Sequence, residues 1–210
     1  MNDKEFLSLR NKIFKYLRPL LGAKLFAHIR GVEAAAVQLA AASSNYGLIQ
    51  KCAVAALLHD AAKSFTLDQM QRVVKLSRGK AFPKEVMQNA GLLHGHVSAI
   101  IARDKFKITD RAIISAIKRH TLGRPDMNAL EKIIFISDYI EPNRRFKGIE
   151  ELRGRVYTAL FSYGLDCALL IVVRDKIKTL AAMNIRIDKT LPAIEKRLTS
   201  KITKNISDIL

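Results

Sequence analysis

The sequence contains little of what sheet-rich, disulfide-linked or membrane-spanning proteins need. Its 210 residues include no tryptophan, two cysteines, five prolines and ten glycines. Few turn-forming residues, together with abundant alanine, leucine, isoleucine and lysine, favour long helices over a sheet or a disordered chain. The longest apolar run, residues 167–173, is far too short to cross a bilayer. We therefore expect an all-α protein with no membrane partner.

The cysteines and the N-terminus predict a cytoplasmic protein. Cys52 and Cys167 lie in apolar runs without the spacing of a pair, which predicts two buried free thiols in a reducing compartment. The first five residues contain acids before any apolar stretch and no small-residue cleavage site, which argues against a secretory signal. The chain is long enough to bury a sizeable core without disulfides.

The net charge of +17 is large and is spread evenly over both halves of the chain. Such an excess is compatible with a nucleic acid, an anionic membrane surface or a polyanionic small molecule as partner. Aromatic residues make up only 7% of the chain, and no helix-turn-helix or base-stacking motif is evident, which weighs against nucleic acid. Charge alone does not choose among these partners.

Apolar residues recur at helical spacing almost throughout the chain. Thr66 followed by Gln69 has the pattern of a capping box, residues 77–83 have the composition of a loop, and Pro142 closes the helix before it. No internal repeat is visible. The spacing predicts helices over residues 3–21, 24–42, 48–62, 66–76, 96–105, 110–119, 127–140, 148–183 and from 190 onward.

The five histidines are the most informative residues, because four of them form a series with two aspartates. The doublet His59-Asp60 ends a wholly apolar run, where an ionised carboxylate costs several kcal/mol unless it is paired or binds a metal. A single histidine is more often a core or surface residue than a ligand, but the combination favours a metal site. The candidate ligands are His28, His59, Asp60, His94, His120 and Asp138.

Mixed imidazole and carboxylate ligands suit iron, manganese or zinc rather than calcium. Six candidates exceed what one tetrahedral zinc uses, which favours two ions. We expect His94 beside a loop, and we interpret His96, two residues further on, as a non-ligand.

Three cations near these ligands are candidates for phosphate binding. Lys63 follows Asp60 by three residues, Arg124 follows His120, and Arg144 follows the helix of Asp138. A guanidinium binds phosphate oxygens bidentately, and a lysine supplies a point charge. In a chain with 36 basic residues, each of the three is equally compatible with a solvated surface.

The segment HTLGRPDMNALEKIIFISDYIEPNR, residues 120–144, closely resembles the most diagnostic stretch of the YqeK-type HD-domain hydrolases. The shorter pieces HIRGV (28–32), LLHDAAK (57–63) and LLHGH (92–96) occur in the order and spacing of that family. The resemblance covers about residues 10–185. It implies an all-helical HD-domain bundle with a buried dinuclear metal centre, whose two metal ions are usually taken to be iron.

The resemblance also implies roles for individual residues. Asp60 would bridge the two ions, and Asp60 and Lys63, the lysine of the HDxxK motif, would be catalytic. Two departures, Ile29 and Gly95-His96, remove no ligand and concern substrate detail. One ion would be held by His28, His59, Asp60 and Asp138, and the other by Asp60, His94 and His120.

The implied activity is symmetrical cleavage of diadenosine tetraphosphate to two ADP through a metal-bridging hydroxide. Lys63, Arg124 and Arg144 would bind the phosphates, and a homodimer is one assembly open to the chain. We expect residues 1–190 to form the HD domain and 191–210 a basic helical extension.

Two alternatives stay open: an HD-domain phosphohydrolase acting on another nucleotide, and a basic nucleic-acid-binding protein whose HD site is structural. The sequence does not indicate which residue stacks on adenine. Phe65, Phe82 and Phe146 lie near the site in sequence and are equally compatible with the core.

Overall fold

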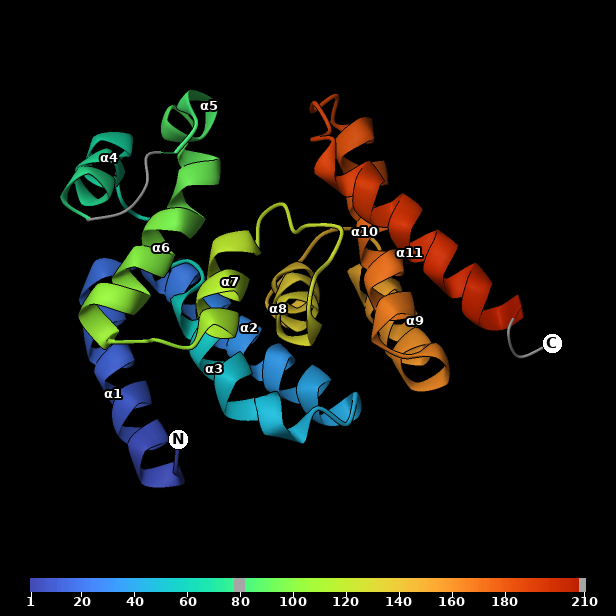
Figure 1. Ribbon diagram of the computed structural model, residues 1–210, viewed down its shortest axis with the longest axis horizontal. Helices are drawn as coiled ribbons and strands as arrows, with labels where there is room; N and C mark the ends of the chain where they lie inside the picture. Colours follow the sequence, from blue (N-terminus) through green and yellow to red (C-terminus); the bar gives the residue numbers. More distant parts are fainter. Residues whose placement is uncertain (78–81, 208–210) are drawn as a thin grey trace.

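The computed structural model describes residues 1–77 and 82–207, and over these residues the chain is helical with no β-strand, which confirms the all-α prediction (Figure 1). None of the helices in these ranges has the length and apolarity needed to span a membrane. The helices are α1 (Asp3–Leu20), α2 (Ala23–Ala42), η1 (Tyr46–Leu48), α3 (Ile49–Leu58), α4 (Leu67–Leu76), α5 (Lys84–Met87), α6 (Ala90–Phe106), α7 (Arg111–Arg119), α8 (Ala129–Ile140), α9 (Ile149–Tyr163), α10 (Leu165–Ala182) and α11 (Thr190–Ser207).

Short polar motifs set where several helices begin and end. The predicted capping box at Thr66 is confirmed: its hydroxyl accepts from the Gln69 N–H, and the Gln69 side chain accepts from the Thr66 N–H. Asn128 begins α8 in the same way with Glu131. At the other end of α8, Glu141 has extended backbone, as expected for a residue that precedes a proline.

Four expectations from the sequence are wrong in detail. The third helix ends at Leu58 rather than at 62, and consecutive turns carry the chain from His59 to Ser64. Helix α6 begins at Ala90 rather than at 96, because the Asn89 side chain caps it, so His94 lies within a helix and not beside a loop. The predicted stretch 148–183 is two helices.

The break between α9 and α10 falls at Gly164, whose φ of 84° belongs to the left-handed region that glycine adopts without strain. Both cysteines are free, but only Cys52 is buried, whereas Cys167 is partly exposed. The predicted loop 77–83 lies partly outside the described residues, since 78–81 are not among them. The short helix α5 was not expected.

Helix α8 is the centre of the molecule (Figure 1). On one side α8 contacts α2, α3 and α7, and on the other side it contacts α9 and α10. Helix α11 packs against α10. The apolar face of α8, including Ile133, Ile134 and Ile136, is fully buried in the shared core. Helices α2, α3, α6 and α7 thus reach one region beside α8.

Candidate metal centre

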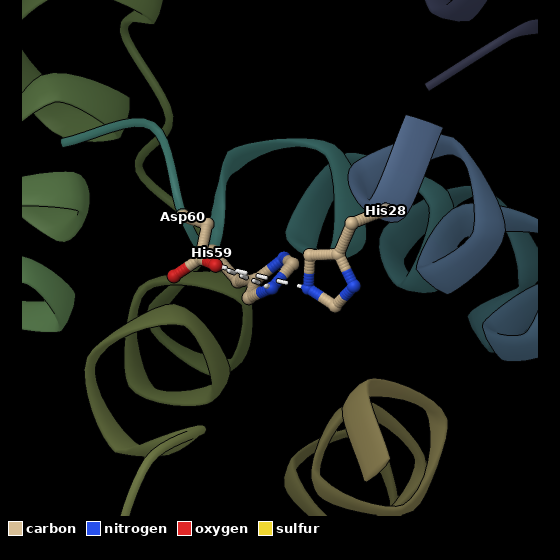
Figure 2. Close-up of side chains that lie close together, drawn as sticks. All are labelled: His28, His59 and Asp60. Carbon is tan, nitrogen blue, oxygen red and sulfur yellow. Dashed lines mark ion pairs between the residues drawn. The ribbon is translucent and has the colours of Figure 1, made fainter. Parts of the chain in front are cut away.

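The six predicted ligands converge from five separate segments of the chain. His28 comes from α2, His94 from α6 and Asp138 from α8, while His59-Asp60 and His120 directly follow the ends of α3 and α7. Figure 2 shows His28 from α2 pointing toward His59 and Asp60 at the end of α3. A helical bundle builds a polar site in its core in this way, with one or two side chains from each element.

Asp60 lies between two sets of imidazoles, and each carboxylate oxygen faces one set. Its Oδ2 atom is 3.7 Å from His28 Nε2 and 3.5 Å from His59 Nε2. Its Oδ1 atom is 3.0 Å from His94 Nε2 and 3.5 Å from His120 Nε2. We call the first set, completed by Asp138, the open set, and His94 with His120 the closed set.

The open set is completed by the second carboxylate. Asp138 Oδ1 lies 3.2 Å from His28 Nε2 and 3.8 Å from His59 Nε2. Ligand atoms bound about 2.1 Å from one ion lie about 3.0–3.5 Å from one another in tetrahedral or octahedral geometry. Most of the separations around Asp60 and Asp138 lie in this range, and the two longest, 3.7 Å and 3.8 Å, slightly exceed it, so small shifts would arrange the donors around common points.

Three of the four imidazoles turn Nε2 inward because a main-chain carbonyl engages Nδ1. Nδ1 of His59 is 2.6 Å from the Ala56 carbonyl, Nδ1 of His94 is 3.3 Å from the Ala90 carbonyl, and Nδ1 of His120 is 2.8 Å from the Ile117 carbonyl. A carbonyl only accepts, so Nδ1 of these rings donates and Nε2 carries a lone pair, which Lys63 approaches at His94 and the Thr121 hydroxyl at His120. Outer partners fix metal-binding histidines in the same way.

Two observations show that a cation fits this cluster. His94 Nε2 and His120 Nε2 lie 3.0 Å apart, so two lone pairs face each other where a shared ion would relieve the repulsion. His59 Nε2 and Asp60 Oδ1 are buried without a hydrogen-bond partner. Buried polar atoms without partners are rare and costly, and metal coordination accounts for both.

The protonation states of His59, Asp60 and Asp138 suit coordination, whereas at His28 burial is outweighed by the hydrogen bonds with Asp138 and Glu141, which raise the pKa of His28. Burial lowers the pKa of His59 to about 4 against the attraction of Asp60, so the imidazole is neutral near pH 7. Burial alone favours the neutral acid of Asp60, but the neighbouring imidazoles outweigh it and hold the pKa of that carboxyl well below its usual range. For Asp138, burial is likewise outweighed, chiefly by the hydrogen bond with His28, and its pKa is also lowered.

The predicted cations differ in where they lie. Lys63 Nζ is 3.6 Å from Asp60 Oδ1 and 3.3 Å from His94 Nε2, because the turn after α3 keeps the three-residue spacing although the helix has ended. Arg144 donates to Asp138 Oδ1 at 2.9 Å. Arg124 instead pairs with buried Glu131, its Nη2 lying 2.9 Å from Oε2, and makes no contact with the six ligands.

A cleft of about 920 Å³ opens onto the cluster. Of the six ligands, His28, Asp60 and Asp138 line it, together with Lys63 and Arg144. The remaining three imidazoles lie beneath and are almost fully buried. A ligand that enters the cleft therefore meets the open set first, between two cations.

Glu141 is a residue of this centre that the sequence pattern did not reveal. It is buried, its Oε1 atom lies 3.1 Å from His28 Nδ1, and its Oε2 atom accepts from the Asn143 N–H at 2.6 Å. A Cβ atom on Gly31 would lie 2.0 Å from Oε2, so Gly31 makes room for this carboxylate. The available signal was an acid just after the helix of Asp138, before Pro142.

Known proteins match the chain in sequence and in structure. The HD domain family model matches residues 25–143. The symmetrical bis(5'-nucleosyl)-tetraphosphatase of Halalkalibacterium halodurans is 37% identical over 153 residues, covering 72% of this chain and 79% of that protein. The protein of the same name from Bacillus subtilis is 37% identical over 136 residues, covering 64% and 70%.

A crystal structure of a predicted HD superfamily hydrolase involved in NAD metabolism from Clostridium acetobutylicum matches with a TM-score of 0.79 at 36% identity, covering 91% of this chain and 97% of that one. The matched fold therefore includes the helices on both sides of α8. With the ligand cluster in the matched segment, and with aligned relatives of one name, this chain belongs to the HD-domain family, in the group that contains the symmetrical bis(5'-nucleosyl)-tetraphosphatases.

Proposed function

We propose that this protein is a metal-dependent hydrolase that cleaves diadenosine tetraphosphate symmetrically to two ADP. Its relatives from Halalkalibacterium halodurans and Bacillus subtilis are named for symmetrical cleavage of bis(5'-nucleosyl) tetraphosphates. The observation that carries the proposal is the placement of Asp60, with one oxygen toward each imidazole set, at the base of a cleft lined by cations.

The centre would hold two metal ions, for which we favour iron, with manganese or zinc as the other candidates. His28, His59 and Asp138 would hold one, His94 and His120 the other, and Asp60 would bind both. When bound, such a pair lowers the pKa of water and polarises a phosphoryl group. The ligands fit all three metals, and the preference for iron follows from the resemblance to the YqeK-type hydrolases.

The protein's own residues would orient the tetraphosphate. Symmetrical cleavage requires water to attack one of the two inner phosphorus atoms and to break the central P–O–P bridge, which leaves ADP on each side. Arg144, 2.9 Å from Asp138, and Lys63, 3.6 Å from Asp60, would balance charge on the phosphate oxygens at this bridge. Arg124 is the weaker candidate, because Glu131 already occupies its guanidinium.

Product analysis with metal analysis tests this function. The protein as purified should contain about two transition-metal ions per chain, as the two sets predict, and should convert diadenosine tetraphosphate to ADP alone. Formation of AMP with ATP would show asymmetric cleavage and would overturn the proposal. Preferred hydrolysis of a nucleoside mono- or triphosphate would favour another HD phosphohydrolase. Salt-dependent RNA binding without metal-dependent hydrolysis would favour the nucleic-acid-binding alternative.

A further inference from the structure

Three phenylalanines lie near the metal centre in sequence, and the structure separates one of them from the other two. Phe65 and Phe82 are partly buried and pack against the hydrophobic core. Phe146 does not belong to that core, is 36% exposed, and lines the same cleft as His28 and Asp138. An exposed aromatic ring in a cleft lined by charged side chains calls for an explanation other than packing.

Phe146 is held in place from behind. Its ring centroid lies 5.7 Å from that of Tyr139, tilted by 52°, and the Tyr139 hydroxyl donates to Asp175 Oδ2 of α10 at 2.9 Å. The segment that follows α8 is also fixed: Arg153 of α9 donates to the carbonyls of Ile140 at 2.8 Å and Glu141 at 2.5 Å. Phe146 is thus a supported ring and not the tip of a free loop.

The charges around this ring match a nucleotide. Lys24 and Arg145 line the same cleft as Phe146. Arg145 donates to the carbonyls of Pro142 and Arg144, and neither cation has an acidic partner within the part of the chain that the structure describes. A nucleotide has a flat base that stacks on an aromatic ring and phosphates that bind cations. Phosphate alone would not need the ring, and an apolar ligand would not need the cations.

We propose that one nucleobase of the substrate stacks on the ring of Phe146, which thus serves as a base platform. Lys24 and Arg145 would lie near the phosphates of the same nucleotide. The inference deepens the proposed function, because it places one nucleoside of a dinucleotide at the α8–α9 end of the cleft. The bridge to be cleaved then lies further in, at Asp60. Phe146 would act on substrate affinity and base selection rather than on the bond-breaking step.

The absence of tryptophan gives a direct test of stacking that needs no catalysis. In Phe146→Trp the new indole is the sole tryptophan, and adenine stacked on it quenches its fluorescence. ADP should quench this emission saturably in the metal-loaded protein, whereas ribose 5-phosphate and tripolyphosphate should not. The matched control is Phe161→Trp on α9, where the side chain is 70% exposed and does not line the cleft. Equal quenching in both variants, or by ribose 5-phosphate, would overturn the proposal.

Kinetics give the second test. Phe146→Ala should raise the KM for diadenosine tetraphosphate and the inhibition constant of ADP about 10–100-fold, as for other bases that lose a stacking partner. The inhibition constant of tripolyphosphate and the metal content should not change, and Phe146→Tyr should restore the affinity. Unchanged KM in Phe146→Ala would refute the base platform while leaving symmetrical hydrolysis intact. If ADP quenches the Phe146→Trp emission but the enzyme releases AMP and ATP, the base platform stands and symmetrical hydrolysis is refuted.

Discussion

The open and closed sets share Asp60 but differ in what surrounds them. In the open set the side chains of His28 and Asp138 are 14% and 19% exposed, whereas in the closed set those of His94 and His120 are 1% and 2% exposed. The closed set is oriented by main-chain carbonyls, whereas His28 is oriented by the side chain of Glu141. The closed set, like His59 of the open set, is therefore fixed by main-chain carbonyls, whereas the rest of the open set depends on side chains at the cleft.

The largest effect is expected from a substitution that disrupts the open and the closed set together. Asp60→Ala deletes the carboxylate that faces both imidazole sets, so metal content should fall from about two ions per chain to near zero and hydrolysis should cease. Elemental analysis and an ADP-release assay measure the two results, and circular dichroism checks that the variant is folded. Full activity with both ions retained would show that Asp60 does not connect the sets.

The next largest effect is expected from a substitution in the closed set alone. His94→Ala should lose one ion and lower activity by more than the roughly 10–100-fold typical of losing an outer partner of a metal ligand. The matched control is His96→Ala, two residues along the same helix, whose ring centroid lies 4.3 Å from that of Phe82 and which is outside the ligand groups formed by the described residues. Metal content and activity should be unchanged in that control. The opposite result would mean that the second ligand set is wrongly assigned.

Much of this centre could be predicted from the sequence, because its ligands carry unusual local signals. A carboxylate such as Asp60 just after the buried run 52–58 is anomalous wherever the chain goes next, so the metal-site prediction does not depend on where exactly α3 ends. Glu141 carries no such signal, since an acid before proline at a helix end is ordinary. Its role exists only because Gly31, over a hundred residues away, leaves space beside it.

Arg124 and Phe146 show the same limit of local pattern. Arg124 lies four residues after the ligand His120, but Glu131 in the next helix holds it through a bidentate contact. Phe146 could not be told from Phe65 and Phe82 until the packing of α8 and α9 left its ring at the cleft. Which cation or ring faces a ligand depends on neighbours that are distant in the chain.

A smaller effect concerns chemistry without metal loss. Lys63→Met should lower kcat and kcat/KM together at unchanged metal content, because a contact made only in the transition state affects both equally. By analogy with the loss of one oxyanion-hole donor, losing this phosphate contact should cost about 2.7–4 kcal/mol, or about 10²–10³-fold. Lys75→Met on α4 is the control, because Lys75 is exposed and does not line the cleft. If Lys63→Met has wild-type kinetics at matched metal occupancy, Lys63 is an ordinary solvated surface residue with no part in the reaction.

The smallest effect should be confined to the open set. In Glu141→Gln the side chain keeps its shape, but an amide has one accepting oxygen where the carboxylate has two. It can accept from His28 Nδ1 or from the Asn143 N–H, and the other donor then faces an NH₂ group. His28 should be held less firmly, which typically weakens metal affinity about 10–100-fold. Titration with metal should therefore show one weakened site and one unchanged site, and excess metal should restore activity. Equal weakening of both sites would mean that the two sets are not separable, because Asp60 would then transmit the change from one to the other.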